Sequence, residues 1–443
     1  MTADAGSYQP PRHLLEVLQK LDYEEALEDG DPRYVDSRVA RGGERTFIRL
    51  ARKFGWDPLS NAFFAPSDKH ILFFGHIGSG KTTELRRYAG ELNASRHFYV
   101  VEVDVLAKLD RNNLQYTEVL MAMAESLLER LHDDGYALGE EALAPLRHWF
   151  GTVVQTHTRN QELSADLKTV AEGGGGLPGL IKLLAHFTAA FKIGASQKTE
   201  WRREIRNDFT TLAAAFNGLL RQLELLLSRD QRAARLLFLI DGTDKMRGED
   251  THKFFVQDAE QLLAIQALVI YTAPLDLKYD GRLDGKLDAD IVLPMIKLVE
   301  RDGRPFVTGL DTMRALLLRR ADRGLFASDA EVDRLVVFSG GHPRELLRLL
   351  KLCCEVADAS IDAAVVETAI QKLASEYRYF LRPDDYTLLK AIDSHPAHGG
   401  NDQRAQELLH RLALLQYNEG TWRRSHPVVR TLEGYDLAPS APA

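Results

Sequence analysis

The sequence predicts an α/β protein built on a doubly wound parallel sheet, followed by a helical second half. Two patterns carry this prediction. Short apolar runs alternate with longer stretches of helical periodicity, which is the order expected of parallel strands joined by crossover helices. After residue 300 the chain shows mainly helical periodicity. The five predicted strands are 71–74, 98–103, 236–240, 267–271 and a short one around 291–293.

Helical segments fill the intervals around these strands, and the predicted ones are 12–30, 46–54, 81–92, 113–131, 180–191 and 201–227. The interval between the second and third strands is unusually long for a single crossover. We interpret residues 141–200 as an inserted helical arm with a mobile centre. The reason is that 153–172 is polar and 173–176 is a run of glycine.

The chain after residue 300 is expected to form a lid of helices at 311–320, 329–338, 344–357 and 361–380. A break at 381–383 precedes a small unit with helices at 384–393 and 402–414 and a hairpin over 415–423. This order is that of a winged helix. The predicted division is an N-terminal helical segment (1–32), a core (33–300), a helical lid (301–381), a winged-helix-like domain (382–436) and a flexible tail (437–443).

Composition restricts the class of protein. The net charge is −8 and the pI about 6.0, which argues against attraction of the whole molecule to nucleic acid. The N-terminus lacks the pattern of a signal peptide. The most apolar stretch, 177–195, is interrupted by Lys182, His186 and Lys192, so no membrane-spanning segment is predicted. Adjacent Cys353 and Cys354 suit a reduced pair in a cytoplasmic protein.

The strongest motif is a phosphate-binding loop. Residues 75–82 match G-x-x-x-x-G-K-[ST] between an apolar run and a helical stretch. Glycines let the loop curl so that backbone N–H groups point at phosphate oxygens, and the helix start adds the positive end of its dipole. The motif predicts a site for a nucleoside triphosphate, ATP, with Mg²⁺. Its candidate residues are Gly75, Gly78, Ser79, Gly80, Lys81, Thr82 and Thr83.

Particular roles follow from the chemistry of the site. Lys81 is expected to reach the β- and γ-phosphates, and the Thr82 hydroxyl to ligate Mg²⁺. Asp241 ends an apolar strand and is the second candidate Mg²⁺ ligand. Asp244 either orients the attacking water or is a turn or helix-cap residue. Thr272 either senses the γ-phosphate or is an ordinary residue at the end of a strand.

Four features occur in order along the chain: the glycine-rich loop, the Asp-Gly-Thr-Asp motif at 241–244, the strand ending in Thr272 and the Gly-His-Pro turn at 341–343. Together they resemble one family. It is the STAND branch of the AAA+ superfamily, the signal-transduction ATPases that include NACHT and apoptotic-type switches. The resemblance implies that Pro343 lies against the adenine and that Arg344 is a lid arginine. It also implies that residues 34–38 edge the adenine pocket.

The chain departs from that family at two places. Lys245 stands where the family usually has a glutamate, and Ala273 and Pro274 follow the sensor threonine where many members have an arginine. Loss of the carboxylate predicts slow hydrolysis, as in a switch whose lid moves between ATP and ADP states. No effector domain or sensing repeat is evident, so the resemblance implies that sensing and output come from a protein partner, from the 141–200 arm or from self-assembly.

Other functions compete with this hypothesis. One is a DNA-associated AAA+ ATPase, a transposition or replication helper whose winged helix contacts DNA. Cations and acids nearly balance from residue 382 onward, although Arg423, Arg424 and Arg430 cluster at the predicted wing. A small-molecule kinase is a third class, but the lid and winged helix offer no evident acceptor pocket. Candidates for an arginine that acts on a neighbouring copy are Arg202, Arg203, Arg206 and Arg282.

Overall fold

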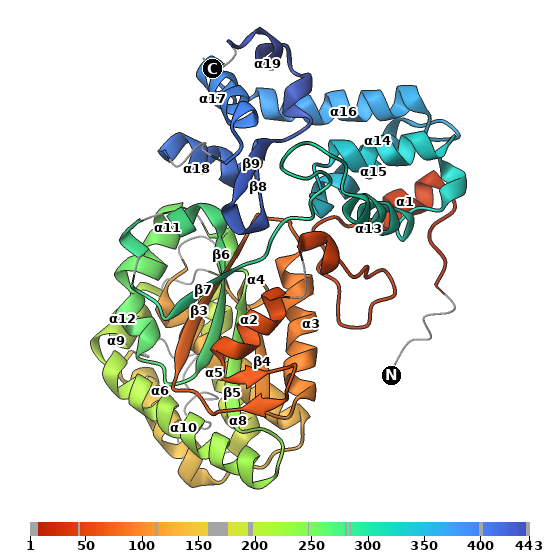
Figure 1. The fold of residues 1–443 in the computed structure, drawn as a ribbon. Coiled ribbons are helices and arrows are strands. Elements are labelled where there is room, and N and C mark those ends of the chain that lie inside the picture. Colours follow the sequence, from red (N-terminus) through yellow and green to blue (C-terminus); the bar gives the residue numbers. More distant parts are fainter. Residues whose placement is uncertain are drawn as a thin grey trace.

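The computed structural model describes residues 8–42, 45–110, 114–157, 176–193, 198–246, 248–279, 281–283, 285–397 and 402–439. Figure 1 shows a sheet with helices on both faces and, beyond one end of it, the helices that follow residue 300. The α/β class predicted from the alternation of apolar runs and helical stretches is therefore confirmed.

Five parallel strands form the central sheet, in the spatial order β4-β5-β6-β3-β7. Each predicted strand is present with its ends shifted by a few residues. The bounds are β3 Lys69–Gly75, β4 Phe98–Asp104, β5 Arg235–Asp241, β6 Leu268–Pro274 and β7 Ala289–Val292. Strand β6 lies between β3 and β5, so the strand that carries Thr272 separates the one before the glycine loop from the one ending in Asp241.

Both faces of the sheet are buried, which explains why its strands are continuous apolar runs. Alternate residues of β3 enter different cores: Leu72 and Phe74 pack on one face, and Ile71 and Phe73 on the other. The Ile71 face is covered by α2 (Arg45–Lys53) and α3 (Lys81–Ala94). The other face is covered by helices of the long interval between β4 and β5.

These interval helices correct the expected inserted arm. They are α5 Tyr116–Asp133, α6 Glu140–His157, α8 Gly176–Ile193, α9 Lys198–Asn207 and α10 Phe209–Arg229. Helices α6 and α8 pack against α10 and α5, and Phe150, Leu184 and Phe187 are buried in the main core. They are thus part of the core layer, because their apolar faces are too large to leave in water. Most of the expected mobile centre, residues 158–175, lies outside the described residues, while 153–157 belong to α6 and 176 begins α8.

Short elements connect the core. They are α1 Leu14–Lys20, η1 Val39–Arg41, β1 Trp56–Asp57, β2 Ala62–Phe63, α4 Val105–Lys108, η2 Thr243–Lys245, α11 Gly248–His252, η3 Lys253–Gln257, α12 Ala259–Leu263, η4 Leu275–Tyr279 and η5 Gly281–Leu283. The predicted helix 12–30 is wrong beyond Lys20. Leu21 adopts an extended conformation there, and Leu27 is buried further along a segment without helix.

The second half contains the expected helices: α13 Val307–Leu318, α14 Asp329–Phe338, α15 Pro343–Val356 and α16 Ala363–Arg378, with η6 Arg323–Leu325 between the first two. The C-terminal unit comprises α17 Pro383–Ser394, α18 Gln403–His410, β8 Leu414–Tyr417, η7 Asn418–Gly420, β9 Trp422–Ser425, η8 Val429–Thr431 and α19 Glu433–Leu437. Strands β8 and β9 form the predicted antiparallel hairpin. The predicted helix 402–414 is too long, because Leu412 turns with φ +62° and the chain then enters β8.

Within the described residues, each helix is either too short or too polar to cross a membrane. Helix α8 contains the most apolar stretch of the sequence, and its Leu180, Leu184 and Phe191 are buried against the rest of the protein. Packing therefore accounts for the apolar character of this stretch.

Candidate functional site

The glycine-rich loop connects the end of β3 to the start of α3. Its Gly78 and Gly80 have φ values of +83° and +92°, a backbone conformation that L side chains rarely adopt. A Cβ atom on Gly78 would also lie 2.6 Å from Nε of Arg344, which approaches the loop from the lid. Ser79 is fully buried, and its hydroxyl has no hydrogen-bond partner within the described part of the chain. The positive φ values of Gly78 and Gly80 therefore require glycine at both positions of the loop.

Lys81 folds back beneath the loop that precedes it. Its Nζ donates to the backbone oxygens of Gly75 and His76, each at 2.9 Å, and lies 2.7 Å from Oδ2 of Asp244. The Lys81 and Asp244 side chains are only 3% and 4% exposed. Burial acts to raise the pKa of Asp244, but the charge and hydrogen bond of Lys81, together with the Lys245 charge, outweigh burial and lower this pKa.

Thr82 and Asp241 meet across the site from α3 and the end of β5. The Thr82 hydroxyl donates to Oδ2 of Asp241 at 2.9 Å. The other oxygen of Asp241, Oδ1, is buried and has no hydrogen-bond partner among the described residues. Burial and the nearby Asp244 carboxylate raise the pKa of Asp241. A hydroxyl and an under-satisfied carboxylate side by side are hard oxygen donors suited to Mg²⁺.

The two remaining candidate catalytic residues are Asp244 and Thr272. Asp244 is held by Lys81 in this conformation and so faces the loop lysine. Thr272 is fully buried in β6, and its Oγ1 lies 3.3 Å from Oγ1 of Thr243. Thr243 also donates to the Thr272 backbone oxygen at 2.5 Å. In this conformation Thr272 therefore contacts the turn that follows β5.

A cavity of about 210 Å³ opens beside the loop. Its walls include residues from the loop, from the ends of β4 and β5, from the lid and from the segment before α2; among them are Lys81, Thr82, Asp104, Asp241, Lys245 and Arg344. A second hollow continues from it toward the lid, and its lining is mixed: Tyr34, Val35, Ile296, Leu316, Pro343 and Leu347 lie beside polar residues that include Glu25, Arg41, Glu84 and Arg320. The sequence-predicted Pro343 and residues 34–35 are thus brought together there.

Arg41 supports the loop from behind and was not singled out from the sequence. It is 6% exposed, and it donates to the backbone oxygen of Ser79 and to that of Pro294, each at 2.7 Å. Its Nε donates to the Ser37 hydroxyl at 2.8 Å. Burial lowers the pKa of this guanidinium. These contacts join parts of the chain far apart in sequence, so local pattern gave no signal for them.

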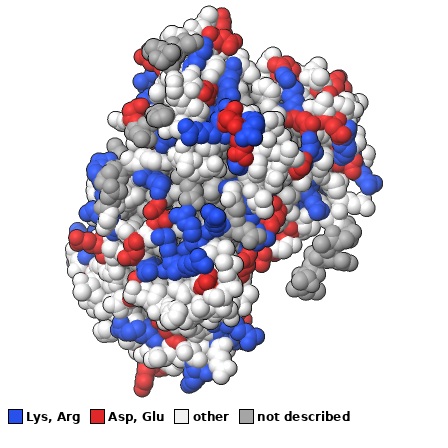
Figure 2. Space-filling model, in the orientation of Figure 1, with Lys and Arg blue, Asp and Glu red and all other residues white. Residues whose placement is uncertain are grey.

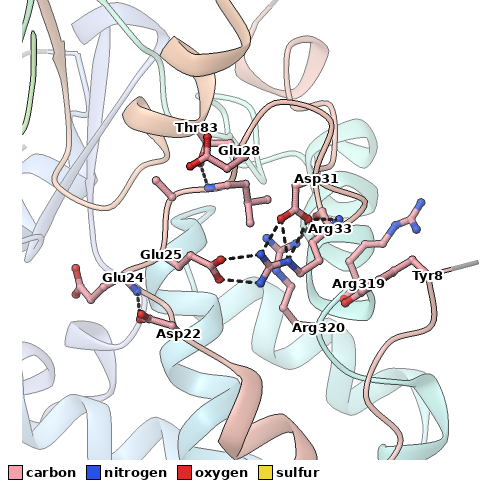
Figure 3. Close-up of polar contacts among 12 residues, drawn as sticks. Tyr8, Asp22, Glu24, Glu25, Glu28, Asp31, Arg33, Thr83, Arg319 and Arg320 are labelled. Carbon is pink, nitrogen blue, oxygen red and sulfur yellow. Dashed lines mark hydrogen bonds and ion pairs between the residues drawn. The ribbon is translucent and has the colours of Figure 1, made fainter. Parts of the chain in front are cut away.

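Residues 23–27, in the segment between α1 and η1, were also missed as part of the site. The backbone N–H of Leu27 donates to the Thr83 hydroxyl at 3.1 Å, and Arg86 donates to the backbone oxygen of Ala26 at 2.9 Å. Figure 3 shows this segment running between the lid helices and the core, where it reaches Thr83. Glu24 of this segment forms an ion pair with Arg344 at 2.6 Å. The Glu24 carboxylate therefore lies at the part of the site where the phosphates are expected.

Buried histidines connect the loop to the second half of the chain. Nε2 of His76 accepts a hydrogen bond from the backbone N–H of Gln416 in β8, at 2.9 Å. His342, in the turn before α15, bonds through Nε2 to the Ile77 backbone oxygen at 3.0 Å. Burial, reinforced by the nearby Lys81 cation, lowers the pKa of His76 to about 3, so His76 is neutral at physiological pH. The loop is therefore bonded directly to both the lid turn and the C-terminal hairpin.

Two groups of arginines named from the sequence have partners within the chain. Arg202 is buried and ion-paired with Glu118, and Arg206 donates to Gln115, so these two do not project as free side chains toward a second copy. Arg423 is 4% exposed and donates to the Gln416 side chain. The predicted basic cluster at the hairpin is therefore partly an internal structural feature.

No protein-family model matches the chain, and no curated protein matches it. Several solved structures are similar at low scores. An Orc1 protein of Aeropyrum pernix in complex with DNA is 13% identical with a TM-score of 0.37, covering 92% of this chain and 84% of that one. A Walker-type ATPase of Pyrococcus abyssi is 13% identical with a TM-score of 0.38, covering 93% and 99%. A RuvB protein of Thermotoga maritima is 11% identical with a TM-score of 0.35, covering 94% and 100%.

The class of the protein rests on its own features. A parallel sheet, a G-x-x-x-x-G-K-T loop between a strand and a helix, and an acidic residue at the end of a second strand define the fold of a P-loop ATPase. A helical region follows this fold on the C-terminal side.

Proposed function

We propose that the chain binds ATP with Mg²⁺ and hydrolyses it slowly, as a regulatory switch. The observation that carries this proposal is the convergence of Lys81, Thr82 and Asp241 on one cavity beside the glycine-rich loop. The loop glycines and the start of α3 supply backbone donors for phosphate oxygens. The base would lie toward the second hollow, beside Pro343 and Val35.

Mg²⁺ would be held by the Thr82 hydroxyl and, through its water shell, by Asp241, and it would neutralise charge between the β- and γ-phosphates. The unpartnered Oδ1 of Asp241 fits this role. Within the described residues, no group of three or more His, Cys, Asp or Glu is placed to hold a metal alone.

The proposal of slow hydrolysis is based on Lys245 and Asp244. Lys245 lines the cavity where the resembling family carries a glutamate, and Asp244 is committed to Lys81. We infer that ATP binding requires Lys81 to turn toward phosphate, which would release Asp244 to orient water. Lys245→Glu should then increase single-turnover hydrolysis, and an unchanged rate would contradict this account of the slow step.

The switch proposal is supported by the bonds from the loop to the second half of the chain. His76 bonds to β8, and His342 bonds to the loop backbone. The Tyr417 hydroxyl also donates to the backbone oxygen of Gly340 in the lid turn, at 2.7 Å. A change of loop shape on nucleotide exchange would therefore disturb the lid and the hairpin together. We infer that their movement controls self-assembly or a protein partner.

Size-exclusion chromatography with light scattering tests this proposal in nucleotide-free, ADP and ATP-analogue states. We expect a change of mass or hydrodynamic radius with the ATP analogue. Lys81→Ala should abolish the change, and Thr82→Ala is a second variant that leaves the buried Lys81–Asp244 pair intact. Identical elution in every state, with nucleotide binding verified by calorimetry, would refute the switch.

A DNA-associated ATPase is the second candidate. Figure 2 shows Lys and Arg side chains gathered near the middle of one face, in the region where Figure 1 places α2. Helix α2 contributes exposed Arg45, Arg49 and Arg52. This candidate predicts DNA binding that weakens steeply as salt concentration rises, and that weakens further in an Arg45→Gln/Arg52→Gln variant. Absence of binding at low salt would exclude it.

A further inference from the structure

The segment between α1 and η1 connects the lid to the core. It runs along the cavity beside the glycine-rich loop, which we call the phosphate cavity. On the lid side, α1 packs against α15, and the Tyr8 hydroxyl donates to the backbone oxygen of Arg319 at 2.6 Å. On the core side, Leu27 and Ala26 are bonded to Thr83 and Arg86 of α3. Residues 23–26 are consequently fixed as part of the cavity wall.

Arg344 is the cation that the lid contributes to this cavity. Its side chain is 15% exposed, and it lies so close to the loop that a Cβ on Gly78 would contact it at 2.6 Å. Its Nη2 bonds to Glu24 at 2.6 Å, while its buried Nε has no hydrogen-bond partner within the described ranges. A guanidinium in this position suits a phosphate, because its fork of donors matches phosphate oxygens.

Glu24 is the acidic residue placed to compete for Arg344. It lines the phosphate cavity but is not among the residues that line the second hollow around Pro343. The neighbouring Glu25 is already held by Arg33 through two bonds of 2.7 Å. Figure 3 shows Glu25 directed at Arg33 and Glu24 directed away from that pair. Glu24 is 54% exposed, so its carboxylate is free to move when a stronger anion enters.

We propose that Glu24 determines the selectivity between nucleoside diphosphate and triphosphate by occupying Arg344 in place of the terminal phosphate. This inference rests on the proposed nucleotide-binding function. A triphosphate brings one more phosphoryl group into the cavity than a diphosphate does. It must therefore displace Glu24 from Arg344 and bear the repulsion of that carboxylate, whereas a diphosphate leaves the pair in place. Glu24 thus favours the diphosphate state until the segment between α1 and η1 moves.

Calorimetric titration of Mg²⁺-ADP and of a non-hydrolysable Mg²⁺-ATP analogue tests the proposal. Glu24→Gln should tighten binding of the triphosphate analogue about three- to sixfold and change ADP binding by less than about twofold, as expected for a half-exposed pair. The gain should be larger at low salt, where screening is weaker. Glu16→Gln is the matched control: it removes an exposed ion pair with Lys20 on α1, outside the cavity, and should leave both affinities unchanged.

A double-mutant cycle connects the effect to Arg344. In an Arg344→Gln background, Glu24→Gln should no longer tighten the triphosphate, because the contested cation is absent. An equal gain for ADP, no gain, or a gain that persists without Arg344 would overturn the inference. Failure of both nucleotides to bind the wild-type chain would overturn the proposed function and this inference with it. Normal binding with no effect of Glu24→Gln overturns this inference alone.

Discussion

Lys81 and Asp244 form a buried ion pair, so removing the lysine should affect stability as well as phosphate binding. Lys81→Ala leaves the Asp244 carboxylate uncompensated, and its Oδ1 is buried without a hydrogen-bond partner in the described structure. Breaking one side of such a pair costs about 3–5 kcal/mol. For a folding unit of about 250 residues, 1 kcal/mol corresponds to about 2 °C in Tm, so we expect a loss of about 6–10 °C.

The assay is thermal unfolding of the nucleotide-free protein, followed by circular dichroism. Asp244→Asn in the Lys81→Ala background removes the stranded charge and should restore at least half of the lost Tm. A Lys81→Ala protein that melts within about 1 °C of wild type would refute the reasoning. A double variant as unstable as the single one would show that the lysine stabilises by its other contacts, the backbone oxygens of Gly75 and His76.

The sign of the pH dependence follows from the lowered pKa of Asp244. A carboxylate whose folded pKa lies below its unfolded value stabilises the fold fully above the unfolded value, near 4. That contribution is lost as pH falls through the lower folded pKa. Wild type should therefore lose stability more steeply than Asp244→Asn when pH is lowered below about 4, as measured by melting at successive pH values.

Three further predictions concern other parts of the site. Asp241→Asn should raise the Tm of the nucleotide-free protein at pH 7, because the raised pKa of Asp241 means that its ionised form is disfavoured in the fold. Calorimetry of the same variant should show weaker Mg²⁺-dependent ATP binding. Arg41→Gln should weaken ADP binding about tenfold, since Arg41 holds the Ser79 backbone; unchanged affinity would contradict this. His76→Ala should leave ADP affinity within about threefold but increase hydrogen exchange in β8, and unchanged exchange would exclude coupling through Gln416.

The secondary structure was largely predictable because local pattern governs it. The strands of the sheet are buried on both faces, and α3 follows a glycine loop with strong sequence constraints. The errors lie where tertiary contacts override local periodicity. Residues 21–30 have a helical pattern but form no helix, because Leu21 and Leu27 are buried along a segment that runs between lid and core. The helices of 141–200 have the expected type but lie in the core layer instead of projecting as an arm.

The sequence by itself determined the α/β class, the position of the phosphate loop and the acid at the end of β5. These depend on neighbouring residues whose spacing is visible along the chain. Only the tertiary structure decided which side chains act on one another: Lys81 with Asp244, Arg41 with the loop backbone, His76 with β8, and Glu24 with Arg344. These partners are separated by tens to hundreds of residues, and their pairing is set by how buried layers pack, which no local pattern encodes.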